Sequence, residues 1–333
     1  MDSIVYIIIG IFVVLYIIDK KEPVQPIVEK LSLEEKKNKV SMTIEDKKQE
    51  ARNEIYKSIL NTVKEINPLK TYNLWTYIEL TEKSHNLQLS YRKLEIPVFF
   101  KKCIERMKQE YPDIIILTPL NIKEYLPEFD IEMGLNATLP LKLRIDILFA
   151  SILEQHGGLC LSPGTILYNV SNPLNLLKSY EIVTFGANKN MLQAQNHIYF
   201  PNSYVLGSQK GTSFIKEYKR NLIMMKNDTH LYNFKNLEGS DILTYLLKLH
   251  KPTQYHFGTD YDGSYNSKYQ TISLKDYMGT MDIDFLNKDK LLFVSIPYDI
   301  LLKTTQYKWL FELSDLQFIE SNLVIKRLLL KDI

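Results

Sequence analysis

The stretch "LEQHGGLCLSPGTILYN", residues 153–169, combines the end of an apolar helix, a glycine turn and a short buried strand. Gly157 and Gly158 end the helix, because glycine adopts the backbone conformations that helix C-caps require. The run "LCLS" that follows has the continuous apolar character of a strand covered on both faces of a sheet. It ends in small and hydroxylated residues, Ser162 to Thr165. The stretch therefore predicts a helix that leads into a central strand of an α/β domain.

The segments on either side of this stretch repeat the alternation of strands and helices. Helices are expected at 97–112, which is amphipathic, and at 141–158; strands are expected at 72–80, 113–118, 159–162, 180–186 and 202–208. This order predicts a Rossmann-like domain with a mainly parallel central sheet. Ligands of such sheets lie beyond the carboxyl ends of the strands, so Trp75-Thr76-Tyr77 and the Ser162–Thr165 turn should border a shared cleft. The closing segment, 295–330, is expected to be helical and to pack across the sheet.

The N-terminal residues predict a membrane anchor. Residues 4–18 contain no charge, and we assign residues 1–19 to a single transmembrane helix that precedes the main domain. A cleaved signal peptide is the alternative, but the basic n-region is missing. Lys20 and Lys21 follow the run, which favours a cytosolic main domain. Sequons at Asn136, Asn169 and Asn227 would permit a lumenal one, so the side of the membrane stays open.

Residues 20–67 form a charged linker followed by an amphipathic helix that begins after Thr43. Ala51, Ile55, Ile59 and Val63 fall on one stripe of this helix. The stripe could pair with a second copy to form a homodimer, or it could pack on the domain that follows, residues 68–333.

Composition excludes several classes of protein. The 41 basic and 39 acidic residues leave a net charge of +2, which argues against nucleic acid as a partner. Two cysteines, Cys103 and Cys160, lie in apolar runs and indicate buried thiols rather than a disulfide framework. The sequence contains no P-loop and no GxGxxG pattern of glycines.

Several motifs together resemble a glycosyltransferase family whose sugar-binding region contains a DXD motif, which includes Och-type mannosyltransferases and capsular polysaccharide synthesis proteins. Leu74-Trp75-Thr76-Tyr77 matches the first strand, and Pro97 with Cys103 matches the P-x-x-x-x-x-C helix. Asp146 stands eleven positions before Gly157, which is the family spacing. The likeness covers about residues 70–215 and continues loosely in "NLEGSDILTYLL", residues 236–247. It implies a GT-A glycosyltransferase fold.

The sequence departs from this family at the metal site. Ser162 and Gly164 occupy the positions of the two DXD aspartates, and Phe149 occupies that of the motif arginine. In the family a divalent ion bridges these carboxylates and the diphosphate of a nucleotide sugar, which is the donor substrate. A hydroxyl and a glycine cannot replace two carboxylates, so Mn²⁺ or Mg²⁺ binding is doubtful and no metal ligand is assigned. The D-x-D triplets at 260–262 and 282–284 lie about a hundred residues past the turn and are expected by chance.

The resemblance, together with the need to replace the charge of the missing metal, suggests roles for nine residues. Asp146 would orient the donor sugar, Asn202 would face the acceptor and Asp241 would reach the cleft from a helix N-terminus. Nucleotide contacts would come from Trp75, Thr76, Tyr77, Lys142, Ser162 and Thr165. Four of them have a structural alternative: a core role for Trp75, an i,i+4 surface pair for Lys142 with Asp146, a turn for Asn202, and a dipole contact for Asp241. His197 and His256 are expected to be structural.

Two functions follow from this interpretation, and a third possibility is that the main domain is a structural membrane component with no ligand. The first is a membrane-anchored glycosyltransferase that moves a hexose from a nucleotide sugar to a glycan or protein acceptor without the usual metal site. The second is a non-catalytic protein of the same fold that binds a glycan, a nucleotide or a protein partner.

Overall fold

A computed structural model describes residues 44–60, 72–84, 92–134, 136–190, 197–227 and 239–330. The chain divides into two units, residues 1–48 and 49–333. The predicted anchor at 4–18 lies outside the described residues. Within them, no helix combines the length and the apolar character that crossing a membrane requires.

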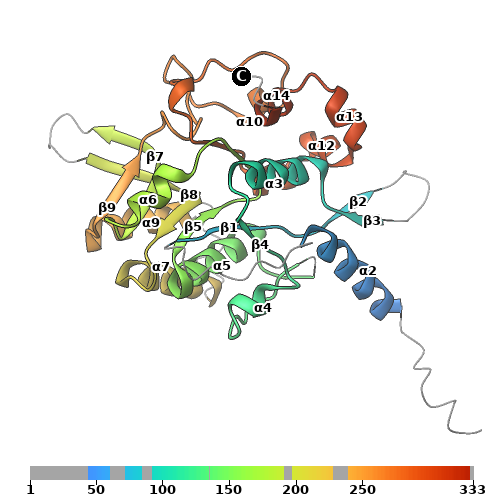
Figure 1. Cartoon of the computed structure of the whole chain (residues 1–333), viewed down its shortest axis with the longest axis horizontal. Helices are drawn as coiled ribbons and strands as arrows, with labels where there is room; N and C mark the ends of the chain where they lie inside the picture. The colour runs from blue at the N-terminus through green and yellow to red at the C-terminus, as the bar shows by residue number, and fades with distance from the viewer. Residues whose placement is uncertain are drawn as a thin grey trace, which may run out of the picture. The chain divides into compact units, whose positions relative to one another are not determined.

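The second unit is built on a six-stranded sheet in the order β4-β1-β5-β8-β7-β9 (Figure 1). These strands are β1 Leu74–Tyr77, β4 Ile115–Leu117, β5 Gly158–Leu161, β7 Ile182–Asn190, β8 His197–Ser208 and β9 Gln254–Phe257. Five strands run in one direction and β8 alone is reversed, because both of its neighbours, β5 and β7, pair with it antiparallel. The prediction of a mainly parallel central sheet is confirmed.

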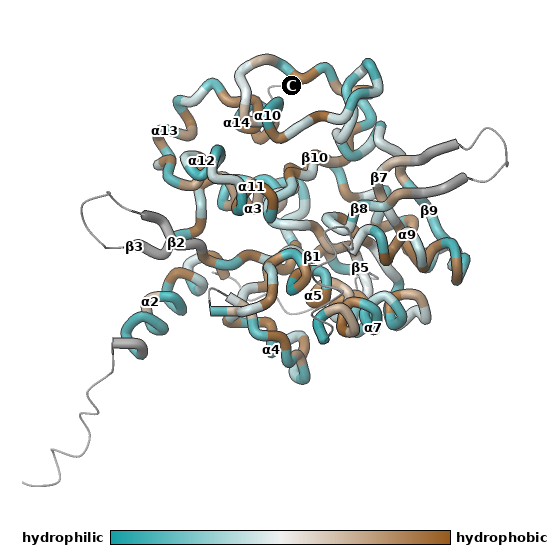
Figure 2. Tube along the Cα trace, turned by 180° about the vertical axis from the view of Figure 1, so that it is seen from behind, coloured by the Kyte–Doolittle hydropathy of each residue, from teal (hydrophilic) through white to brown (hydrophobic). Residues whose placement is uncertain are grey.

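The predicted helices of the main domain are also present. Helix α3 (Val98–Glu110) lies on one side of the sheet, and α5 (Leu141–His156) and α7 (Ser213–Asn227) lie on the other (Figure 1). Helix α9 (Gly239–His250) contacts α7 and β8. Helix α5 is buried at every position from Lys142 to Leu153, in keeping with its hydrophobic colouring in Figure 2. Its burial on all sides makes it the central helix of the domain.

The closing segment differs from its expected form. It begins with strand β10 (Phe293–Ser295), which pairs antiparallel with β6 (Thr165–Leu167) directly after the Ser162–Thr165 turn. Four short helices follow, and three of them contact α3: α11 Tyr298–Lys303, α12 Trp309–Glu312, α13 Asp315–Glu320 and α14 Val324–Leu330. The segment is therefore largely helical, as predicted, but its first residues extend a small second sheet.

Shorter elements complete the described chain. Strands β2 (Thr81–Ser84) and β3 (Arg92–Glu95) form an antiparallel pair. The short helices are α4 Ile122–Tyr125, α6 Ser171–Leu176 and α10 Leu274–Tyr277, with 3-10 turns at Lys288–Lys290 and Thr305–Tyr307.

Helix α2 (Ile44–Ile59) begins after Thr43, as the sequence predicts. The expected apolar stripe is not its most buried face, since Ala51 is exposed and Ile55 and Ile59 are half-buried. Tyr56 is buried instead, and its hydroxyl accepts a hydrogen bond from the Leu80 backbone N–H at 3.1 Å. The aromatic anchor was missed because a tyrosine beside a stripe of aliphatic residues gives no periodic signal.

Candidate functional site

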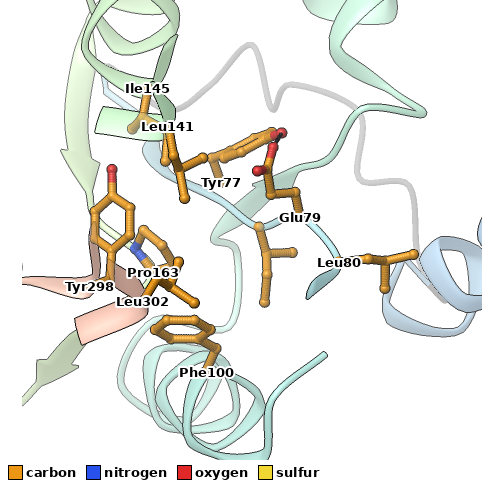
Figure 3. A pocket seen from close by; sticks show the side chains of 10 residues that line it. Tyr77, Glu79, Leu80, Phe100, Leu141, Ile145, Pro163, Tyr298 and Leu302 are labelled. Carbon is orange, nitrogen blue, oxygen red and sulfur yellow. Dashed lines mark hydrogen bonds between the residues drawn. The ribbon is translucent and has the colours of Figure 1, made fainter. Parts of the chain in front are cut away.

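A cavity of about 380 Å³ lies at the carboxyl edge of the sheet (Figure 3). Strand β1 contributes Tyr77 at its end, and the turn after β5 contributes Pro163. The remaining wall is mostly apolar and comes from 78–80, α3, α5 and α11: Ile78, Glu79, Leu80, Phe100, Leu141, Ile145, Tyr298 and Leu302. Tyr77 of the first strand and Pro163 of the Ser162–Thr165 turn thus line one cavity, but the other predicted residues, Trp75, Thr76, Ser162 and Thr165, are not part of its lining.

The charged side chain on the cavity wall is Glu79, and it is paired. Two Arg144 guanidinium nitrogens donate to its two carboxylate oxygens at 2.8 and 2.9 Å. The Tyr77 hydroxyl also donates to Glu79, at 2.7 Å. This bidentate arrangement fixes both planar groups and leaves no net charge on the pair.

Beside the cavity, helix α5 holds a buried ion pair one turn apart. The Lys142 ammonium lies 2.5 Å from Asp146 Oδ1 and 2.5 Å from Ser203 Oγ on β8. It also lies 4.9 Å from the centre of the Tyr204 ring, within cation–π range. The predicted i,i+4 pair exists, but it is an interior pair, because Lys142 is 9% exposed and Asp146 is 2% exposed.

Burial controls the electrostatics of Asp146. Removal from water raises the pKa of its carboxyl from 3.8 to about 6, although the Lys142 charge and hydrogen bond act in the opposite direction. The nearby Asp299 carboxylate adds to the increase. Asp146 therefore titrates near neutral pH, which is uncommon for an aspartate outside functional sites.

The start of helix α9 fits closely against this carboxylate. A Cβ atom added to Gly239 would lie 2.4 Å from Asp146 Oδ2 and 2.7 Å from the Tyr218 hydroxyl. A larger residue at this position would displace one of these side chains or the start of α9, which gives a physical reason for the glycine in the "EGSD" sequence.

The Ser162–Thr165 turn is covered by the closing segment. Ser162 and Thr165 are 1% and 0% exposed, and their hydroxyls hydrogen-bond to each other at 3.0 Å. The Ile296 N–H donates to the Gly164 carbonyl at 3.0 Å, and a Cβ on Gly164 would lie 2.5 Å from the Ile296 carbonyl oxygen. The turn therefore directs its polar groups inward and has no open face for a diphosphate.

Two residues of the closing segment lie near Asp146 and were not predicted. Asp299 is 6% exposed and accepts a hydrogen bond from the Tyr204 hydroxyl at 2.8 Å. Tyr298 is 1% exposed and packs beside Pro163 and Leu302 at the cavity wall (Figure 3), and its hydroxyl has no hydrogen-bond partner among the described residues. Burial, with the Asp146 and Asp299 charges, raises the pKa of Tyr298 well above 10.0. Neither residue belongs to the resemblance motifs, so sequence reasoning had no signal for them.

The other predicted residues are placed as follows. Trp75 is fully buried and donates to the Gly157 carbonyl at 3.0 Å, which corresponds to its core alternative. Thr76 is fully buried, and its hydroxyl finds no hydrogen-bond partner in the described ranges of the chain. Asn202 is half-buried and lies 3.5 Å from Asp262, while its side-chain oxygen accepts from Val205 N–H. Asp241 is exposed in the first turn of α9.

The fit of a divalent metal can be judged from the donor groups. Ser162 and Gly164 offer no carboxylate, and the Ser162 hydroxyl is bound to Thr165. Asp260 approaches Lys290, Asp262 accepts two hydrogen bonds from Ser264, and Asp282 pairs with Arg327. The described part of the chain holds no cluster of three or more His, Cys, Asp or Glu side chains that could bind a metal ion. These residues do not fit the metal of the DXD motif.

The predicted structural histidine His256 is consistent with its surroundings. Its ring nitrogens lie 2.9 Å from Thr184 Oγ1 and 3.1 Å from the Gly186 carbonyl. Burial lowers its pKa to about 4, so the ring is neutral at physiological pH. The His197 side chain lies outside the described residues.

Comparison with known proteins gives one family match. Residues 94–247, just under half of the chain, match the family model described as "Capsular polysaccharide synthesis protein". No curated protein matches the sequence. Among solved structures, the bifunctional IspDF from Campylobacter jejuni matches 64% of this chain and 55% of its own, so the chain spans about half its length, with 8% identity and a TM-score of 0.31. That structural likeness is too low to carry an argument. The family match supports a glycosyltransferase-like protein over the stretch from β3 to α9, which contains Asp146, Gly157 and Gly239.

Proposed function

We propose that the protein is a membrane-anchored glycosyltransferase that moves a hexose from a nucleotide sugar to a glycan or protein acceptor without a DXD-bound metal. The observation that carries this proposal is the position of Asp146, which keeps the motif spacing to Gly157 and lies beside a cavity at the carboxyl edge of the sheet. The family match over residues 94–247 supports the same class of protein.

Transfer without the metal needs another source of positive charge for the leaving diphosphate. Lys142 is the cation nearest to Asp146, and its ammonium is held by Asp146 and Ser203. In this proposal, donor binding moves the closing segment away from Gly164, and Lys142 then meets the diphosphate. Asp146 would accept hydrogen bonds from the donor sugar, and Tyr77 would contact the nucleotide.

A second candidate function, binding without transfer, is favoured because the closing segment covers the Ser162–Thr165 turn. Ser162, Thr165 and Asp146 are all nearly inaccessible, and Ile296 lies directly over Gly164. A protein of this fold that binds a glycan, a nucleotide or a protein partner, without transfer, needs no access to these groups.

The two functions differ in their response to donor. Thermal unfolding of the full chain in detergent should be measured with UDP-glucose and with GDP-mannose, each with and without Mn²⁺. The transferase proposal expects stabilisation by one donor, independent of Mn²⁺, that is lost in Asp146→Asn, together with hydrolysis or transfer of the hexose. Stabilisation without any turnover would favour the second function, and no stabilisation by either donor would contradict the first.

Membrane attachment is proposed from residues 4–18. Cells expressing the full chain and a variant without residues 1–19 should be fractionated. The full chain is expected in the membrane fraction after a high-salt wash, and the shortened chain in the soluble fraction. Equal distribution of the two would contradict the anchor.

A further inference from the structure

A second cleft, of about 670 Å³, lies on another face of helix α5. Leu141 and Ile145 of α5 line the carboxyl-edge cavity, whereas Ile147, Ser151 and Glu154 line this cleft. The segment 126–131, the start of α7 and the residues between β8 and α7 supply its other walls. The cleft and the cavity share no lining residue, so the cleft is a separate site. We call it the α5–α7 cleft.

The α5–α7 cleft combines an apolar interior with charged walls. Leu126, Phe129, Ile131 and Ile147 are all less than 8% exposed and contribute apolar surface. Its volume falls within the range of about 300–1,000 Å³ that is usual for small-molecule sites. Such an interior can contact the carbon-bound hydrogens of a ligand rather than its polar groups.

The charges on the two walls have opposite sign. Lys210 and Lys216 come from the side of α7, and Glu128 and Asp130 come from the 126–131 segment. All four are exposed, and none of their side chains makes an ion pair or hydrogen bond with the described residues. By contrast, Lys219 and Glu154 in the same cleft are paired at 2.9 Å. The open space therefore separates two sets of unpaired, complementary groups.

Few ligands satisfy both sets at once. An ammonium only donates hydrogen bonds and a carboxylate only accepts them, whereas a hydroxyl does both. A phosphate would satisfy the lysines but would be repelled by Glu128 and Asp130. A saccharide carries hydroxyls around its edge and carbon-bound hydrogens on its faces, which matches the charged walls and the apolar interior together.

We propose that the α5–α7 cleft binds an uncharged saccharide chain through Glu128, Asp130, Lys210 and Lys216. This inference does not rest on the transferase proposal, because it requires neither a nucleotide sugar nor access to Asp146. A protein that binds a glycan here could hold an acceptor or a product away from the carboxyl edge.

The test uses the full chain in detergent, with maltotriose, mannotriose and cellotriose as probes, in saturation-transfer NMR and calorimetry. At least one trisaccharide should bind. Asp130→Asn and Lys216→Gln, which keep side-chain size and remove charge-assisted hydrogen bonds, should each weaken binding about tenfold. Lys248→Gln on α9, an exposed lysine outside the cleft, is the matched control and should bind as the wild type does.

Any one of three results would overturn the inference that the α5–α7 cleft binds a saccharide. Absence of binding by all three trisaccharides would show that the cleft is not a saccharide site. Equal binding by wild type, Asp130→Asn and Lys216→Gln would place the saccharide elsewhere. Displacement of the trisaccharide by the dipeptide Glu-Lys at lower concentration would assign the cleft to a zwitterionic peptide. None of these results depends on stabilisation by UDP-glucose or GDP-mannose, which tests the transferase proposal separately.

Discussion

Lys142 and Asp146 form an ion pair at 2.5 Å in which both side chains are almost fully buried. Removing one partner of such a pair leaves an uncompensated charge in the interior. Asp146→Ala should therefore lower the free energy of unfolding by about 3–5 kcal/mol. The double variant Lys142→Met/Asp146→Leu replaces both charges by apolar groups and should recover most of that loss. Urea unfolding followed by circular dichroism measures both, and equal destabilisation of the two variants would contradict this account.

The free energy of unfolding should depend on pH through the protonation of Asp146. Its carboxyl has a pKa of about 6 in the folded chain and an ordinary value of 3.8, so between these pH values the folded state binds more protons than the unfolded state. The stabilisation that the protonated Asp146 carboxyl gives the folded state is complete below about pH 4. It is lost as the pH rises through 6, by about 3 kcal/mol in total.

The matched comparison for this pH effect is Asp146→Asn, which cannot titrate. The difference in unfolding free energy between wild type and this variant, measured from pH 4 to pH 7, isolates the Asp146 contribution. A difference that is flat across this range, or that favours the wild type as the pH rises, would be incompatible with the raised pKa.

Gly239→Ala tests the close fit between α9 and Asp146. The added Cβ would lie 2.4 Å from a carboxylate oxygen of the buried Asp146, so either that side chain or the start of α9 must move, at a cost of about 1–3 kcal/mol. Gly258→Ala is the control, since an added Cβ there has nothing within 4 Å. Thermal unfolding of both variants should show a lower midpoint for Gly239→Ala alone. A similar midpoint for both would mean that α9 can shift without cost.

Tyr298→Phe and Tyr277→Phe should have different effects on stability. Within the part of the chain that the structure describes, the buried Tyr298 hydroxyl has no partner, so its removal should leave the free energy of unfolding unchanged or raise it by about 1 kcal/mol. The Tyr277 hydroxyl donates to the Gly263 carbonyl at 2.7 Å, and its loss should cost about 1 kcal/mol. Equilibrium unfolding in urea distinguishes them. Destabilisation by Tyr298→Phe would show that its hydroxyl has a partner in solution.

Much of the fold was predictable because the local sequence patterns indicate the same strands and helices that form the sheet and its covering layers. The apolar runs of β1, β4 and β5 and the periodicity of α3 indicate alternating elements, and glycine at 157 has a positive φ of 70°. The reversal of β8 was not predictable from its residues. An antiparallel partner and a parallel partner impose the same extended backbone, so direction depends on the connections between strands.

The candidate site was predictable only in part. The resemblance placed Asp146 and the Ser162 turn near one edge of the sheet, and the cavity lies there. It could not show that Ile296 and Tyr298 cover the turn, because contacts between residues more than a hundred positions apart produce no periodic pattern in the sequence. Burial of Lys142 was likewise unexpected, since a lysine is rarely interior unless paired.

The pairing of β6 with β10 also sets an order for chain synthesis. Thr165 lies opposite Ser295, so the turn at Ser162 stays open on a growing chain until 130 further residues have been made. A contact of such long sequence separation forms late in folding. During that interval the apolar cavity wall lacks the cover that Tyr298 and Leu302 provide. A chain that ends before Phe293 would leave the ribosome with this surface permanently open and would be prone to aggregate.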